Sequence, residues 1–229
     1  MKAKIYNLII LDKSGSMESI RKEAIDGYNE TLGMIKAAQL KFLETQEHRI
    51  SLTTFCDCGM DMIYDMVPVK DAEKLSKVKY EPCCGTPLYD AIGISVKKLK
   101  ECVKGDKQAN VVVSIITDGF ENASKEWSGA AVKALIDELK EEGWMFSFIG
   151  SAYNAKELAM KISITNTMQW SNTPDGTREM FVQENDARSR HYSRLQNLSE
   201  SGTGHLNEEE LKAQKRKISD NYFNKKIKN

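Results

Sequence analysis

The sequence predicts an α/β fold of the three-layer, Rossmann-like, doubly wound type. We expect a mostly parallel six-stranded sheet with one antiparallel edge strand and helices on both faces. Short apolar, β-branched runs alternate with amphipathic segments of about 10–20 residues, a pattern typical of parallel sheets with helical crossovers. The run 110–117 (NVVVSIIT) is continuously apolar, which is typical of a strand that is buried on both faces.

Each strand is predicted from its own pattern. Residues 60–67 alternate between apolar and acidic side chains after a tight turn at 57–59. That alternation favours a half-solvated strand at the sheet edge, antiparallel to the strand before it, and Pro68 suits the end of an edge strand. The other strands are expected from short apolar or β-branched runs. Together the six expected strands are residues 4–11, 49–56, 60–67, 110–117, 144–149 and 167–170.

Helices are predicted where apolar residues recur at helical spacing. Ser16, Thr86 and Ser128 are suitable N-caps for the helices that follow them, and Pro87 suits a first helical position. The expected helices are residues 17–46, 71–78, 87–103, 128–142, 155–162 and 174 to about 198.

Length and composition bound the domain organisation. The 229 residues suit one domain over 1–198, followed by a charged C-terminal extension over 199–229 that we expect to be flexible or helical. Lys+Arg and Asp+Glu both number 33, so nothing in the charge points to nucleic acid or to a membrane surface. There is no apolar run of about 18–20 residues and no signal-peptide cleavage site near the start. We therefore expect a cytoplasmic address.

The five cysteines are an odd number, which agrees with a reducing compartment. Cys56, Cys58, Cys83 and Cys84 lie in two close pairs. Packed or free thiols are the favoured interpretation, because these spacings differ from the usual C-x₂-C of metal sites. A disulfide or a four-thiolate zinc site remains the alternative. The three scattered histidines are expected at the surface.

Oxygen-bearing side chains follow two predicted strands and precede one predicted helix. Asp12, Ser14 and Ser16 alternate after the first strand; Thr86 precedes a helix, and Asp118 follows the central strand. Each is also explained by a helix cap or a turn when taken alone. Because parallel strands end at one edge of the sheet, we expect these residues to converge. Two carboxylates with three hydroxyls suit a hard cation such as Mg²⁺ or Mn²⁺.

In this order the motifs resemble the von Willebrand factor type A domain with its metal-ion-dependent adhesion site, over about residues 1–198. The sequence around Thr86 and Asp118 is similar to that of bacterial, intracellular members of the family. The resemblance implies that Ser14 and Ser16 bind the cation directly. Thr86 and Asp118 then alternate between direct and water-mediated contact, while Asp12 acts mainly through water. The cation is expected to be Mg²⁺, with Mn²⁺ or Ca²⁺ as alternatives.

The implied function is a metal-dependent protein-interaction module whose partner presents a Glu or Asp to the open coordination position. We do not expect an enzyme, because no residue stands in an obvious base or nucleophile role. One alternative is a Mg²⁺-dependent phosphohydrolase with Asp12 as nucleophile, although position 14 is serine where that chemistry needs a second aspartate. The other is a redox or zinc module built on the cysteines. The sequence does not determine the partner or the oligomeric state.

Overall fold

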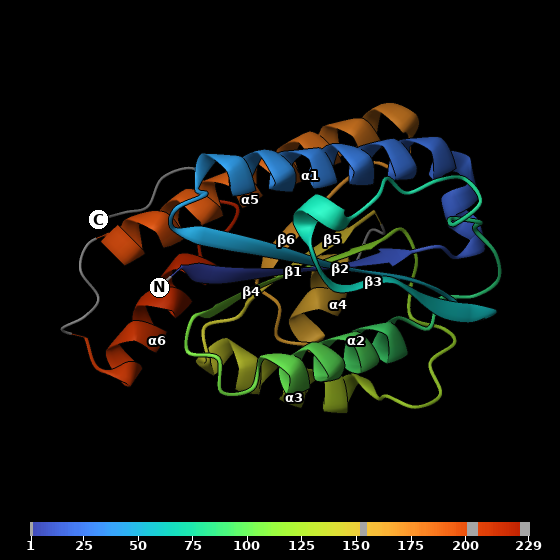
Figure 1. The fold of residues 1–229 in the computed structure, drawn as a ribbon. Coiled ribbons are helices and arrows are strands. Elements are labelled where there is room, and N and C mark those ends of the chain that lie inside the picture. The colour runs from blue at the N-terminus through green and yellow to red at the C-terminus, as the bar shows by residue number, and fades with distance from the viewer. Residues whose placement is uncertain (1, 152–154, 201–205, 225–229) are drawn as a thin grey trace.

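The computed structural model describes residues 2–151, 155–200 and 206–224. Six strands form one sheet in the order β3-β2-β1-β4-β5-β6, with helices above and below it (Figure 1). The strands are β1 Ala3–Asp12, β2 Gln46–Cys56, β3 Gly59–Pro68, β4 Ala109–Thr117, β5 Met145–Gly150 and β6 Asn166–Gln169.

The strand directions confirm the predicted fold class. β1 pairs in parallel with β2 and β4, β5 continues the parallel pairing to β6, and only β3 is antiparallel. The five parallel strands therefore end at the same edge of the sheet. In the β1–β4 register Leu11 lies opposite Ile116, so the last residues of both strands, Asp12 and Thr117, are neighbours at that edge.

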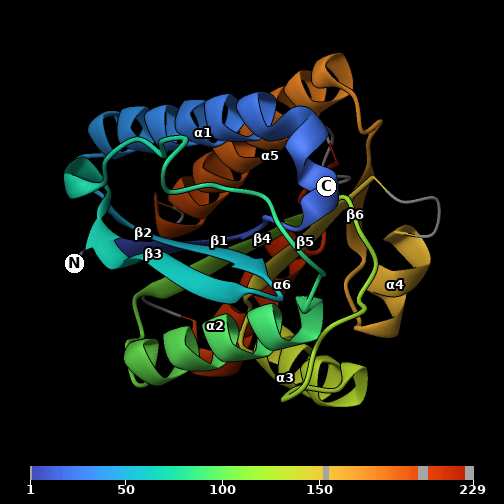
Figure 2. The same ribbon diagram turned by 90° about the vertical axis from the view of Figure 1, so that its right-hand side faces the viewer.

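The helices form two layers on the sheet. Helices α1 and α5 cover one face, and α2, α3 and α4 cover the other (Figure 2). Helix α6 packs beside α3, α5 and β5. The helical elements are η1 Gly15–Ile20, α1 Arg21–Lys41, η2 Val69–Asp71, α2 Leu88–Val103, α3 Gly129–Glu141, α4 Ala155–Lys161, α5 Pro174–Glu200 and α6 Glu208–Ser219. Among the described residues, no helix has both the length and the apolar character needed to span a bilayer.

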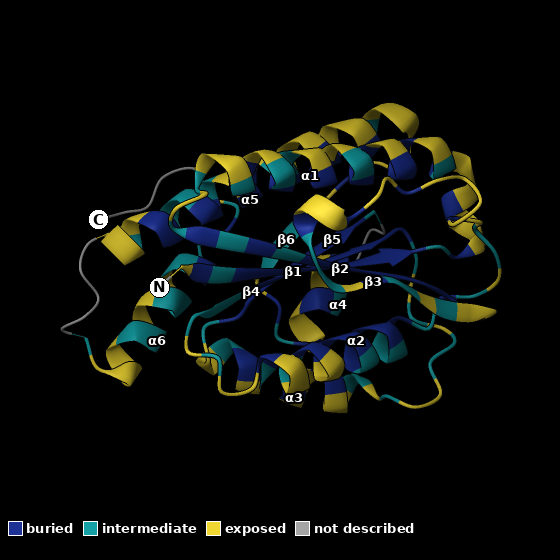
Figure 3. Ribbon diagram, viewed as in Figure 1, coloured by how far each residue is buried: buried dark blue, intermediate teal, exposed yellow. Residues whose placement is uncertain are grey.

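Strand β1 lies between two apolar cores because successive side chains point to opposite faces. Ile5 and Ile9 pack in the core beneath α1 and α5, whereas Leu8 and Ile10 pack in the core above α2 and α3. The sheet is dark with buried residues while the outer helix faces are exposed (Figure 3). Each such fully buried side chain stabilises the fold by about 1.5–3 kcal/mol.

A buried polar cluster joins α5 to the sheet. Arg188 is fully buried, and its guanidinium donates to Asn7 Oδ1 at 3.0 Å, Ser114 Oγ at 2.7 Å and Glu184 Oε1 at 2.9 Å. The Tyr222 hydroxyl donates to the same Glu184 oxygen at 2.9 Å. A buried charge must be paired and hydrogen-bonded; Arg188 and Glu184 pair with each other, while Arg188 Nε and Glu184 Oε2 have no hydrogen-bond partner among the described residues.

The segment after α5 packs onto the domain, which differs from the separate extension predicted for 199–229. Helix α6 (Glu208–Ser219) begins with a capping box at Asn207, and Ser219 Oγ donates to Gly143 O at 3.1 Å. Tyr222 is fully buried. The segment was expected to be flexible or helical, and Glu208–Ser219 is helical; residues 201–205 and 225–229 lie outside the described part of the chain.

One predicted helix is absent. Residues 71–78 were expected to be helical, but only the single turn η2 forms, and the chain then runs irregularly across α1. Asn29 of α1 receives the Leu75 N–H at 2.7 Å and donates to Leu75 O at 3.0 Å, and Lys36 donates to Ala72 O at 2.7 Å. These side-chain bonds satisfy backbone groups that a helix would otherwise pair.

The caps and bounds of two helices also differ from the prediction. Helix α1 begins at Arg21, so Ser16 lies inside the 3-10 turn η1, and α1 ends at Lys41 because the chain turns into β2. Helix α2 begins at Leu88 without a side-chain cap from Thr86. Ser128 does cap α3 as predicted, by accepting from Ala131 N–H. Ser16 and Thr86, the two predicted caps that do not cap a helix, are both predicted metal ligands.

The histidine prediction is wrong for the two described histidines. His48 and His191 are each 1% exposed. His48 lies in β2 against the Tyr192 ring, and His191 lies in α5 against the Tyr222 ring. Their scattered positions gave no signal of burial, because the contacts come from residues distant in sequence. His205 lies outside the described residues.

Candidate metal centre

The structure brings together all five predicted ligand residues at the carboxyl edge of the sheet. They come from three loops: the turn after β1, the loop before α2 and the loop after β4. Short parallel strands that end at one edge force this meeting, as in other open α/β sheets. The residues are Asp12, Ser14, Ser16, Thr86 and Asp118.

Asp12 is fully buried at the end of β1, and two hydrogen bonds fix its carboxylate. Oδ1 accepts from the Ser14 N–H at 2.7 Å, and Oδ2 accepts from the Thr117 hydroxyl at 2.6 Å. Burial raises the pKa of Asp12 to about 6, although these hydrogen bonds favour the ionised form. The carboxylate therefore lacks a compensating positive charge.

The two serines connect Asp12 to the loop after β4. Ser14 Oγ lies 3.2 Å from Ser16 Oγ, and the Ser16 hydroxyl donates to Asp118 Oδ1 at 2.6 Å. The other Asp118 oxygen accepts from Asn172 Nδ2 at 2.7 Å. Burial also raises the pKa of Asp118. Oxygen atoms from both loops thus lie within hydrogen-bond distance of one another.

Thr86 reaches the same place from the loop before α2. Its N–H donates to Asn122 Oδ1 at 2.8 Å, and Asn122 N–H donates back to Thr86 O at 3.1 Å. A Cβ at Gly119 would lie 3.0 Å from Thr86 Oγ1 and 3.8 Å from Asp12 Oδ2. The space beside Gly119 is therefore lined by the oxygens of Thr86 and Asp12, and a side chain there would crowd both.

The charge of the site fits a divalent cation. Asp12 and Asp118 are both buried, and no lysine or arginine forms an ion pair with either within the described ranges. Buried charges require partners, and carboxylate and hydroxyl oxygens are the donors that Mg²⁺, Mn²⁺ and Ca²⁺ prefer. Ser16 is exposed while Ser14 is buried, so the site opens to solvent at Ser16. Metal binding itself stays a prediction.

Two acidic residues hold the loop after β4 in place. The Asp90 carboxylate accepts the N–H groups of Lys125, Glu126 and Trp127 at 2.7–2.9 Å. Glu121 accepts the N–H groups of Tyr89, Ala123 and Ser124 at 2.8–3.0 Å. The start of α2 is thereby joined to the Asp118 loop. Two of the three ligand loops are therefore joined by hydrogen bonds.

The sequence reasoning missed three residues that support the ligands. Thr117 and Asn172 hydrogen-bond to the two carboxylates, and the buried Tyr80 hydroxyl donates to the Asp12 carbonyl at 2.5 Å. Thr117 was detectable, because it ends the strand that precedes Asp118. Asn172 follows β6 and Tyr80 lies in a long loop, so neither carries a local signal.

All four clustered cysteines lie beside this edge, and the favoured interpretation of free thiols is wrong for two of them. Cys58 and Cys84 form a disulfide. Cys56 and Cys83 are free, with their sulfur atoms 3.0 Å apart. The parallel pairing of β2 with β1 explains this proximity, because β2 ends beside the Asp12 loop.

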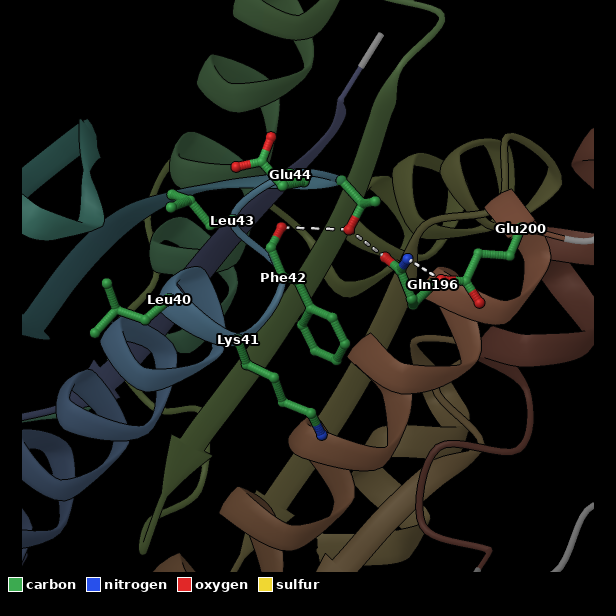
Figure 4. A pocket seen from close by; sticks show the side chains of 8 residues that line it. Leu40, Lys41, Phe42, Leu43, Glu44, Gln196 and Glu200 are labelled. Carbon is green, nitrogen blue, oxygen red and sulfur yellow. Dashed lines mark hydrogen bonds between the residues drawn. The ribbon is translucent and has the colours of Figure 1, made fainter.

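A separate hollow lies at the opposite edge of the sheet (Figure 4). It has a volume of about 440 Å³ between the end of α1 and α5, and the Thr45 hydroxyl there donates to Gln196 Oε1 at 2.6 Å. Leu40 and Leu43 line it and are exposed. None of the five candidate ligands lines this hollow.

Comparison with known proteins places the fold. No family model and no curated protein matches the sequence. Among solved structures, a von Willebrand factor type A protein from Catenulispora acidiphila is 14% identical with a TM-score of 0.53, covering 80% of this chain and 42% of that chain. The present chain thus spans less than half the length of that protein. The chain has the von Willebrand factor type A fold, as the resemblance implied.

Two further similar structures contain a bound metal. The manganese-loaded TRAP protein of Plasmodium vivax is 14% identical with a TM-score of 0.51, covering 78% of this chain and 72% of that chain. The proximal thread matrix protein 1 of the mussel byssus, with a zinc-occupied MIDAS motif, is 13% identical with a TM-score of 0.53, covering 82% and 46%. At these identities the comparisons establish the fold.

Proposed function

We propose that this chain is a metal-dependent protein-interaction module. A divalent cation, Mg²⁺ in the first instance, is held by Asp12, Ser14, Ser16, Thr86 and Asp118. The observation that carries the proposal is their convergence: oxygens from three loops meet around two buried carboxylates that have no basic partner among the described residues. The manganese-loaded and zinc-occupied relatives of the same fold support it.

The hydrogen bonds support different roles for the proposed ligands. Both Asp12 oxygens already accept protein hydrogen bonds, so Asp12 supplies charge and positions Ser14 more than it supplies free lone pairs. Thr86 Oγ1 and the serine hydroxyl oxygens are neutral ligands for the cation. A cation bound mainly by neutral oxygens keeps much of its charge, so it attracts a further anionic ligand.

The surface around the site suits a protein partner. The site opens at the exposed Ser16, and Phe120, two residues after Asp118, is 48% exposed. An exposed aromatic side chain beside a charged centre is typical of interaction surfaces. We propose that a partner Glu or Asp binds the cation while apolar groups of the partner contact Phe120. The chain acts in the cytoplasm as a binding module without catalytic turnover.

Thermal melting with and without metal tests the site. Mg²⁺ at a hundredfold excess over its Kd stabilises a folded protein by about 2.7 kcal/mol, which raises the Tm of a domain this size by roughly 5–10 °C. Ser14→Ala should abolish this rise, whereas Ser76→Ala, at an exposed position in the irregular segment, should retain it. A wild-type melting curve that is unchanged by Mg²⁺, Mn²⁺ and EDTA would refute the proposal.

Capture of partners from the source cell tests the function. Proteins retained by the wild type in Mg²⁺ should be released by EDTA and should not bind Ser14→Ala. Phe120→Ala should keep the Mg²⁺-dependent rise in Tm but lose part of the captured protein. Retention that is equal in Mg²⁺ and EDTA would mean that the metal does not mediate binding.

A further inference from the structure

Four cysteines converge beside the oxygen site, and backbone hydrogen bonds bring them there. The loop of Cys83 and Cys84 lies between the turn after β1 and the turn after β2. On one side Cys83 N–H donates to Lys13 O at 2.9 Å, and Gly15 N–H donates to Cys84 O at 3.0 Å. On the other side Asp57 N–H donates to Gly85 O at 3.0 Å. The positions of the two cysteine pairs are thus fixed by three segments of the fold.

The sulfur atoms occupy one small volume. Cys56, Cys58 and Cys83 have their Sγ atoms within 4.8 Å of one another, and Cys84 is bonded to Cys58. Adjacent residues of an extended chain point to opposite sides. Cys84, however, has a φ of 58°, and this left-handed turn directs the side chains of Cys83 and Cys84 to the same cluster.

We propose that these four cysteines form a zinc site when the Cys58–Cys84 disulfide is reduced. In a tetrahedral Zn²⁺ site with Zn–S bonds of about 2.3 Å, the sulfur atoms lie about 3.8 Å apart. The sulfur atoms of Cys56, Cys58 and Cys83 already lie within 4.8 Å of one another, so small adjustments suffice to reach this spacing. Thiolates favour zinc, whereas the nearby oxygen site offers only carboxylate and hydroxyl ligands. The proposed zinc site thus differs in ligand chemistry from the oxygen site, and this inference does not depend on the proposed function.

The surroundings of the cysteine cluster leave it accessible to an ion. A Zn²⁺ ion with four thiolates has a net charge of −2. Two lysines lie beside the same turns, and each forms an ion pair with an aspartate: Lys13 with Asp61, and Lys125 with Asp57 at 3.1 Å. Cys56 is buried, while Cys58 and Cys84 are exposed. The cluster is thus anchored on one side and open to an entering ion on the other.

The chemistry of loading balances. Reduction of the Cys58–Cys84 disulfide takes two electrons and two protons from a dithiol reductant, which becomes a disulfide itself. Zn²⁺ then replaces the protons of four thiols, and these protons pass to solvent. Because the loop of Cys83 and Cys84 continues into Thr86, the bound zinc ties a ligand loop of the oxygen site to the turn after β2.

Metal analysis of the full chain, purified anaerobically with a dithiol reductant, tests the proposal. We expect one equivalent of zinc per chain. Titration of the zinc-free reduced protein with Co²⁺ should give the intense sulfur-to-cobalt charge-transfer absorption of a tetrahedral thiolate site, and Zn²⁺ should abolish it. The same spectrum is expected for Ser14→Ala, because the oxygen site contributes no sulfur.

A matched pair of variants locates the site. Cys56→Ser should lose most of the zinc and the charge-transfer band. Cys102→Ser, at the exposed free cysteine of α2, should keep both. The wild-type cobalt spectrum decides the matter even if Cys56→Ser fails to fold. Reduced wild-type protein without zinc and without the cobalt band overturns the proposal. Mass spectrometry that finds disulfides Cys58–Cys84 and Cys56–Cys83 under the same reductant also overturns it.

Discussion

Asp12 and Thr117 end neighbouring parallel strands, and the Thr117 hydroxyl donates a 2.6 Å hydrogen bond to Asp12 Oδ2. This bond places a buried carboxylate in a fixed orientation at the centre of the candidate metal site. Burial nevertheless raises its pKa to about 6. The carboxylate therefore opposes folding when no cation is bound and supports it when one is bound.

In EDTA, Asp12→Asn should be more stable than the wild type at pH 7. The folded-state pKa of Asp12 is raised from 3.8 to about 6, so ionisation disfavours the folded state as pH rises through this window. The gain should be at most about 3 kcal/mol at pH 7 and should vanish below pH 4. Urea unfolding at both pH values measures it. With saturating Mg²⁺ the order should reverse, and a wild type that is more stable in both buffers would contradict the prediction.

Asn172→Ala should weaken metal binding without removing a ligand. Asn172 Nδ2 donates to Asp118 Oδ2 at 2.7 Å, and partners that orient ligands typically contribute 10- to 100-fold to metal affinity. Titration with Mn²⁺, followed by the rise in Tm, gives the change in Kd. Ser171→Ala, at an exposed neighbouring position, is the control. Equal affinities for the two variants would show that Asn172 does not position Asp118.

Acid should destabilise the fold through its two buried histidines. Burial lowers the pKa of His48 to about 4 and that of His191 to about 3, and Arg188 contributes to both shifts. Since the unfolded chain binds these protons near pH 6.5, stability falls as pH drops below that value. We expect a loss of roughly 2 kcal/mol per histidine between pH 7 and pH 5. Urea unfolding in saturating Mg²⁺ measures it, and His48→Gln should halve the slope.

Tyr222→Ala should destabilise the whole domain, because Tyr222 is fully buried and bonds Glu184. Truncation of a buried aromatic residue costs about 3–5 kcal/mol. Tyr222→Phe removes only the hydroxyl bond to a carboxylate and should cost about 1.5–3 kcal/mol. Asn224→Ala, at an exposed neighbouring position, is the control. If Tyr222→Ala unfolds like the wild type, the segment after α6 does not contribute to the core.

The hydrophobic pattern was sufficient to predict the sheet. Alternation in 60–67 indicated the edge strand β3, and the continuous apolar run 110–117 indicated the central strand β4. Both signals are local, because a side chain's exposure follows from its position along the strand. The irregular chain at 72–78 was not predictable, because Asn29 and Lys36 hold it from another element.

The sequence by itself determined which candidate ligands follow which strand. Asp12, Ser14 and Ser16 follow one strand and Asp118 follows another, because residue type and strand end are both local features. Only the tertiary structure decided which groups support them. Asn172, Tyr80 and the cysteine pairs reach the site through contacts between segments distant in sequence. The burial that raises the pKa of Asp12 also arises from packing. The local sequence pattern determines which strand or loop carries a side chain. The partners of that side chain depend on how the strands and loops pack.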